Sequence, residues 1–181
     1  MVTSFNEGNK FYILGEFTDE LQETIIVPLV KQIEELKTKK DAELIIYISS
    51  VGGSTWIART IVSLLELAKS KDIIVKTIVT SHAFSSGSMV SIVGTKGYRF
   101  IDTYAEIMIH YGTYQGYSDK TPLQIERNSE YRKRHFDNIL KHYKKYSKVP
   151  DLEKLIADDG LCIPADKCIE WGLADKYMGE L

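Results

Sequence analysis

Two apolar runs, each followed by small residues and then by a helical pattern, constrain this 181-residue chain more than any other feature. The runs are Leu44–Ile48 and Ile73–Val79, and such nearly continuous runs are typical of strands buried on both faces of a sheet. The first leads into Gly52-Gly53 and a helix over 54–69. The second leads into a turn over 81–88 and a short helix from Gly87 to about Val93. Alternating strands and helices predict an α/β fold.

The rest of the chain continues this alternation. A first strand is predicted over 11–14, followed by a helix over 19–37 that Thr18 caps. Pro28 lies inside that helix, so it either kinks the helix or occupies a place where the lost hydrogen bond is tolerated. Later patterns predict two strands within 98–110, a long helix over 122–146, short helices near 152–157 and 165–171, and a final strand over 173–175.

The long predicted helix has an aromatic stripe and a basic surface. The stripe comprises Tyr131, Phe136, Ile139, Leu140, Tyr143 and Tyr146, a spacing typical of core or subunit contacts. The basic residues around it fit a solvated face or ion pairs between subunits. His135 and His142 are assigned to the same structural class, and His82 receives no role.

Charge and composition exclude several classes of function. The chain has 23 Lys and Arg against 25 Asp and Glu, which argues against neutralising nucleic-acid phosphates. It has no apolar run near the roughly 20 residues that span a membrane, and its first ten residues do not resemble a secretory signal. Cys162 and Cys168 have no His or Cys pair nearby. We expect a cytoplasmic protein without a metal, a cofactor, nucleic acid or a membrane as partner.

Three pieces of sequence carry possible chemistry. They are Gly52-Gly53 after one strand, Ser85-Ser86-Gly87 after the next, and His110 at the end of a third. A serine at a strand-to-helix turn can act as a nucleophile, a histidine can take its proton, and glycine N–H groups can stabilise an oxyanion. Read separately, each piece is also typical of a turn, a helix cap or a structural histidine.

Further blocks accompany these pieces in order along the chain. They are Thr95–Phe100, Ile107–His110, Tyr114–Gly116 and Ala165–Asp175. Together with Ser50–Gly53 and Ala83–Gly87, these blocks resemble the motifs of the proteolytic subunit of the Clp protease, over about Phe11 to Asp175. Val51 stands where that family has proline, and Ser86 stands where it has methionine.

The resemblance implies a serine-protease site. Ser85 corresponds to the nucleophile, ahead of its rivals Ser86 and Ser88, and His110 to the general base that later acts as general acid. The backbone N–H groups of Gly53 and Ser86 correspond to the oxyanion hole. The residues flanking an extended peptide substrate are Gly52, Ser54, Thr55, Thr113, Tyr114, Gln115 and Gly116.

The acidic member of the triad falls in a short acidic turn. Alignment of the following block places it at Gly160, and a shift of one residue delivers Asp159, with Asp158 as the alternative. Asp158-Asp159-Gly160 can also be a plain turn. A Ser–His dyad remains possible, since the acid only orients and stabilises the imidazole.

The resemblance also implies an architecture and partners. We expect one domain over 1–181 with the crotonase-like fold, a spiral of ββα units, and a handle region over about 111–148. The implied assembly is a ring-shaped homo-oligomer, stacked as a double ring, with an AAA+ unfoldase or a Clp-type paralogue as partner. The implied activity is hydrolysis of unfolded proteins or peptides through an acyl-serine. The alternatives are a catalytically silent scaffold subunit and a crotonase-type acyl-CoA enzyme.

Overall fold

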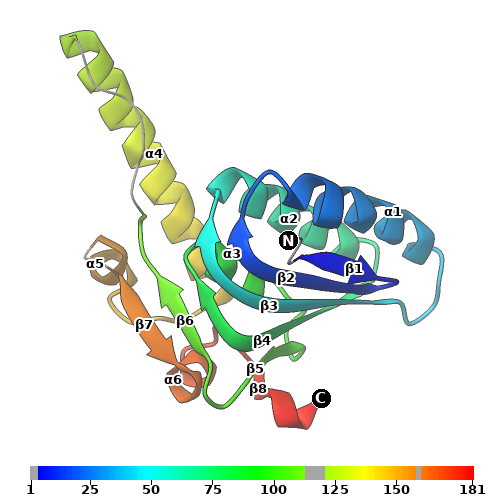
Figure 1. Cartoon of the computed structure of the whole chain (residues 1–181). Coiled ribbons are helices and arrows are strands. Elements are labelled where there is room, and N and C mark those ends of the chain that lie inside the picture. Colours follow the sequence, from blue (N-terminus) through cyan, green and yellow to red (C-terminus); the bar gives the residue numbers. More distant parts are fainter. Residues whose placement is uncertain (1–3, 113–120, 158–159) are drawn as a thin grey trace.

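The computed structural model describes residues 4–112, 121–157 and 160–181, which form a sheet flanked by helices (Figure 1). The sheet runs β1-β2-β3-β4-β5-β8, and β6 pairs with both β4 and β7. Its strands are β1 (Phe5–Glu7), β2 (Lys10–Phe17), β3 (Glu43–Gly53), β4 (Ile74–Phe84), β5 (Arg99–Ile101), β6 (Glu106–Ile109), β7 (Leu161–Pro164) and β8 (Lys176–Tyr177). Only the β1–β2 and β6–β7 pairs are antiparallel within the part of the chain that is described. The predicted α/β class is confirmed.

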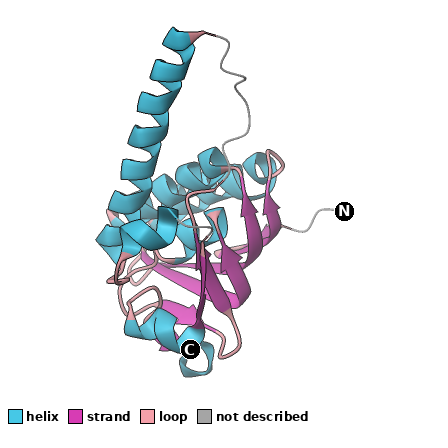
Figure 2. Ribbon diagram, turned by 90° about the vertical axis from the view of Figure 1, so that its left-hand side faces the viewer, coloured by secondary structure: helices cyan, strands magenta, loops and turns pink. Residues whose placement is uncertain are grey.

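The helices pack beside this sheet, except for one that extends away from it. They are α1 (Val27–Leu36), α2 (Thr55–Lys69), α3 (Ser86–Ser91), α4 (Pro122–Tyr146), α5 (Leu152–Ala157) and α6 (Ala165–Glu170), with a final 3₁₀ turn over Met178–Glu180. Figure 1 shows α1 and α2 along one side of the strands, and Figure 2 shows most of α4 projecting beyond the body of the molecule. The predicted bounds of α4 and α5 are confirmed.

Pro28 is accommodated by a change of helical register. A π-helical turn over Gln22–Ile26 precedes α1, and the N–H of Val27 donates to the carbonyl of Gln22, five residues earlier. Pro28 therefore lies in the first turn of a new helix, where a missing N–H costs little. The predicted cap at Thr18 is wrong, because the helical structure begins after Leu21 and no side chain caps it.

The strand containing Leu44–Ile48 is buried on one face only, which corrects the prediction from its composition. Leu44, Ile46 and Ile48 are buried, whereas the alternate residues are half-buried. Tyr47 stacks on Tyr12 with ring centroids 4.8 Å apart, and Tyr12 stacks on Phe5 at 4.5 Å. Aromatic side chains thus cover part of the second face, so an apolar run does not require helices on both sides.

The edges of the sheet were predicted least well. The final strand is Lys176–Tyr177 rather than 173–175, and the strands β1 and β7 were not predicted. Asp175 accounts for the first difference, because its carboxylate accepts from the N–H of Gly97 at 2.7 Å and binds Arg99. Residues 173–174 are therefore drawn into a turn against α6 before pairing begins.

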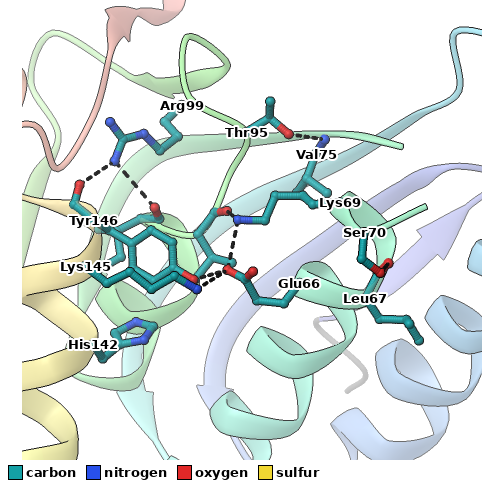
Figure 3. Close-up of polar contacts among 12 residues, drawn as sticks. Glu66, Leu67, Lys69, Ser70, Val75, Thr95, Arg99, His142, Lys145 and Tyr146 are labelled. Atoms are coloured by element: carbon teal, nitrogen blue, oxygen red, sulfur yellow. Dashed lines mark hydrogen bonds and ion pairs between the residues drawn. The ribbon is translucent and has the colours of Figure 1, made fainter. Parts of the chain in front are cut away.

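The base of α4 is joined to α2 by a polar cluster around Glu66 (Figure 3). The Glu66 carboxylate accepts from the Tyr146 hydroxyl and lies 2.9 Å from Lys69 Nζ and 3.2 Å from Lys145 Nζ. Lys69 also donates to the carbonyl of Val93 at 2.8 Å. Burial by itself raises the pKa of Glu66, but the hydrogen bonds from Tyr146 and Lys69 outweigh it and lower the pKa to about 2.

This cluster predicts a pH-dependent contribution to stability. Because the folded-state pKa of Glu66 is lowered, its contribution is present above the unfolded value near 4.5 and is lost as the pH falls toward 2. We expect Glu66→Gln to lower Tm at pH 7, and the difference from the parent to shrink as the pH falls from 4.5 to 2. Thermal unfolding, monitored by circular dichroism, measures this Tm difference. Glu34→Gln, in an exposed pair with Lys37, is the control. A Tm difference between Glu66→Gln and the parent that does not change with pH would contradict the prediction.

Candidate active site

The candidate site lies where β3, β4 and β6 end. β4 is parallel to β3 on one side and to β6 on the other, with Phe84 paired to Met108. Ser85 and His110 follow directly after these paired segments, and the Ser85 N–H donates to the Met108 carbonyl at 2.9 Å. Gly53 ends β3. The strand order therefore brings together the three pieces that the sequence singled out.

Ser85 has a strained backbone. Its φ of 52° and ψ of −118° are rare for a residue with a side chain, and it lies at the N-cap of α3. The Ser85 carbonyl accepts from the Ser88 hydroxyl at 2.6 Å and from the Ser88 N–H at 3.0 Å, which hold this conformation. A serine forced into such a turn points away from its own backbone, as a nucleophile requires.

Gly52 and Gly53 allow the end of β3 to approach this turn. Their φ values are +102° and +131°. A Cβ at position 52 would lie 2.7 Å from the Ser85 Cβ and 2.8 Å from the Phe84 carbonyl, and a Cβ at position 53 would lie 2.7 Å from the Phe17 carbonyl. A side chain at position 52 would collide with the Ser85 turn and one at position 53 with the backbone of Phe17 in β2, so Gly52 is required by the approach to the turn and Gly53 by the approach to β2.

His110 presents an unsatisfied nitrogen. Its Nε2 is buried and makes no hydrogen bond with any of the residues described, Ser85 included. Burial lowers the pKa of His110 below its ordinary value of 6.5, which favours the neutral imidazole. A buried polar atom without a partner is uncommon in proteins. A neutral imidazole with such a nitrogen is chemically able to accept a proton.

Ser85 and His110 line the same cavity, which has a volume of about 650 Å³. Gly53, Ser54 and Thr55 form part of its wall. The alternative serines, Ser86 and Ser88, are not among the residues that line this cavity. Ser86 and Ser88 are fully buried, and their hydroxyls donate to Gly53 and Ser85 carbonyls respectively. The geometry therefore favours Ser85 as the reactive serine.

Other predicted residues fall outside the described part of the chain. These are Asp158, Asp159, Thr113, Tyr114, Gln115 and Gly116. Gly160 is described, and a Cβ there would lie 2.8 Å from the His110 Cβ. Gly160, the residue that follows Asp158 and Asp159 in the sequence, thus packs against His110. It also means that an aspartate could not replace Gly160 without displacing the histidine.

Nine residues of the cavity wall were not among the predicted site residues, and four of them lie on α4. Tyr131, His135, Ile139 and Tyr143 recur every four residues and line the cavity beside Ser85. The stripe was interpreted as core or subunit contact, and His135 was left out of it. The equal spacing of these four residues was the sequence signal that could have identified them as one lining surface. The other lining residues that were missed are Glu16, Trp56, Met89, Tyr111 and Gly112.

The described residues contain neither a cluster of metal-ligating side chains nor a membrane-spanning helix. No group of three or more His, Cys, Asp or Glu side chains is arranged to hold a metal ion in residues 4–112, 121–157 and 160–181. Over the same residues, no helix is both long and apolar enough to cross a membrane.

Comparison with known proteins identifies the fold and the family of this chain. A solved structure of a mutant ClpP1 from Listeria monocytogenes superimposes with a TM-score of 0.77, at 19% identity, over 94% of this chain and 91% of the other. This match shows the crotonase-like fold, with α4 as the handle helix. An ATP-dependent Clp protease proteolytic subunit from Ligilactobacillus salivarius is 27% identical over 166 residues, 92% of this chain and 81% of its own length. The model of the Clp protease family matches residues 4–180, so the chain belongs to the Clp protease family.

Proposed function

We propose that this member of the family hydrolyses peptide bonds with Ser85 as nucleophile and His110 as general base. The observation that carries the proposal is the buried, unpartnered Nε2 of His110 on the same cavity as the strained Ser85. Family membership makes the chemistry that of a serine protease. The assignment of roles to individual residues rests on the geometry and on the motifs.

The reaction follows from the groups around the cavity. The Ser85 Oγ attacks the peptide carbonyl carbon, and its proton passes to His110 Nε2. The negative charge that develops on the carbonyl oxygen is stabilised by the N–H groups of Gly53 and Ser86. His110 then gives the proton to the leaving amine, which leaves an acyl-Ser85 ester. Water activated by His110 hydrolyses that ester and restores the free serine.

The acid and part of the substrate cleft stay predictions from the sequence. We assign Asp159 to orient His110, and the packing of Gly160 on His110 supports a carboxylate arriving from this side. The backbone of Gly52–Thr55 on one side and of 113–116 on the other would pair with an extended peptide. An unfolded chain or a short peptide meets this requirement, whereas a folded protein does not.

Family membership also indicates an oligomeric ring. We propose that the ring is homo-oligomeric and stacked face to face through α4, which projects from the body (Figure 2). In such an assembly the sites face an inner chamber, and access to that chamber selects the substrate. An AAA+ unfoldase or a second Clp-type subunit is the partner expected for this arrangement, in the cytoplasm.

The test is intact-mass measurement after treatment with a fluorophosphonate, on protein whose assembly is measured by light scattering. One adduct is expected, absent from Ser85→Ala and strongly reduced in His110→Ala. An assembled ring that forms no adduct would contradict the proposal and support a silent scaffold subunit. An adduct that persists in Ser85→Ala would assign the nucleophile to another residue.

The pH dependence of this reaction tests the role of the acidic turn. The rate should rise with pH as the His110 imidazolium loses its proton. In the double variant Asp158→Asn, Asp159→Asn we expect the midpoint below 6.5, because burial lowers the pKa of His110. In the parent we expect a higher midpoint, since a nearby carboxylate stabilises the imidazolium. The rate of fluorophosphonate reaction over about pH 5 to 9 measures both. Equal midpoints would show that no carboxylate of this turn reaches His110.

A further inference from the structure

The proposed oxyanion hole depends on a peptide between two glycines. The N–H of Gly53 belongs to the peptide that joins Gly52 to Gly53, and both residues have positive φ. Glycine backbone rotates more freely than that of any other residue. A donor that stabilises a transition state must nevertheless be held in its final orientation before the reaction. Pairing with Glu16 and Phe17 of β2 holds this segment on one side, and a contact from α3 can hold it on the other.

The peptides on either side of it are held by hydrogen bonds. On the first side, the Gly52 N–H donates to Ser50 Oγ at 3.0 Å, and the Ser50 hydroxyl donates to the Gly15 carbonyl. On the second side, the Ser54 N–H donates to the Phe17 carbonyl at 2.8 Å. The carbonyl of that second peptide, which belongs to Gly53, accepts from Ser86 Oγ at 2.8 Å.

Ser86 is placed to link the two parts of the hole. Its side chain is fully buried, it is the first residue of α3, and its own N–H is the other proposed donor. Its hydroxyl donates to the Gly53 carbonyl at the end of β3. The Ser88 hydroxyl instead bonds to the Ser85 carbonyl and to the Tyr143 hydroxyl, and the Ser91 hydroxyl donates to the Ser88 carbonyl. Ser86 stands where the family has methionine, so a residue that departs from the family motif makes this contact between α3 and β3.

We propose that Ser86 is a positioning residue, whose hydroxyl holds the Gly53 carbonyl and so keeps the Gly53 N–H directed at the developing oxyanion. This inference rests on the proposed function of the site. The hydroxyl does not touch the substrate. It fixes the distance and orientation between the Gly53 N–H at the end of β3 and the Ser86 N–H at the start of α3.

The first test is the kinetics of Ser86→Ala on a short peptide substrate. Removing the hydroxyl leaves both backbone donors present but takes away the hydrogen bond on the Gly53 carbonyl, so the Gly53–Ser54 peptide keeps only the bond from the Ser54 N–H to the Phe17 carbonyl among those described. We expect kcat to fall about 10- to 100-fold, with KM within about twofold of the parent, because the lost interaction matters in the transition state. Ser91→Ala is the matched control. It removes a buried hydroxyl from the same helix that bonds only to Ser88, and we expect it to retain the parent kcat.

Amide hydrogen exchange of the segment 50–55 gives a readout that does not require activity. Exchange in this segment should be faster in Ser86→Ala than in the parent and unchanged in Ser91→Ala. A parent that hydrolyses peptides, with Ser86→Ala retaining kcat or falling no further than Ser91→Ala, would overturn the inference while the proposed function stands. A parent that neither turns over nor forms the Ser85 adduct would overturn the proposed function. In that case, unchanged exchange in Ser86→Ala would also show that Ser86 does not hold the segment 50–55.

Discussion

Replacement of Ser85 by alanine is expected to lower kcat for peptide hydrolysis by about 10⁴- to 10⁶-fold, with assembly unchanged. The change removes the atom that forms the acyl intermediate, and the remaining oxyanion donors provide only a small residual rate. Among the described residues the Ser85 hydroxyl makes no hydrogen bond, so its loss should not affect folding. Initial rates with a fluorogenic peptide measure the effect.

Two further measurements make the Ser85 result specific. Ser81→Ala changes an exposed serine near the end of β4, and it should keep the parent rate. Light scattering of each variant shows whether the oligomer has formed, since an unassembled site would also be inactive. Turnover in Ser85→Ala within about tenfold of the parent would contradict the assignment of the nucleophile.

Removal of the Asp175 carboxylate is expected to cost about 3–5 kcal/mol of folding free energy, the second large effect. Asp175 binds Arg99 through both carboxylate oxygens, at 2.8 Å and 2.5 Å, and the two side chains are only 13% and 6% exposed. Arg99 also donates to the carbonyls of Tyr146 and Gly172. Asp175→Ala would leave a buried guanidinium charge without its counter-ion, where solvation by water is poor.

The change in stability is measured by denaturant or thermal unfolding of Asp175→Ala. For a chain of this size the expected loss corresponds to a Tm lowered by about 6 to 20 °C. Glu170→Ala is the matched control, because it removes a carboxylate from an exposed ion pair with Lys167, whose side chains are 57% and 44% exposed. That pair should contribute about 0–1 kcal/mol. Equal losses in the two variants would contradict the difference attributed to burial.

The same ion pair shows how distant motifs become one structural unit. Thr95–Phe100 and Ala165–Asp175 were identified separately as blocks that resemble a family. In the structure Arg99 of the first and Asp175 of the second form a salt bridge that also fixes the end of α4 through the Tyr146 carbonyl. Nothing in the spacing of the two blocks indicates this contact, because it depends on how β5, α4 and the C-terminal segment pack.

Local patterns predicted most of the elements because they depend on neighbouring residues. The helical periodicity and Pro122 predicted α4, and the helical spacing over 54–69 predicted α2. The same reasoning failed at Thr18 and at 173–175. In both places a contact with a distant part of the chain, or a change of helical register, outweighed the local preference.

The sequence by itself determined the α/β class and the order of most of the elements, and it singled out Ser85 and His110 as the proposed reactive pair. These follow from periodicity, from turn residues and from motifs that are continuous along the chain. Only the tertiary structure decided that α4 contributes Tyr131, His135, Ile139 and Tyr143 to the cavity, and that Ser86 holds Gly53. Such contacts join residues that are far apart in sequence, and their geometry is set by the packing of strands and helices, which no local pattern encodes.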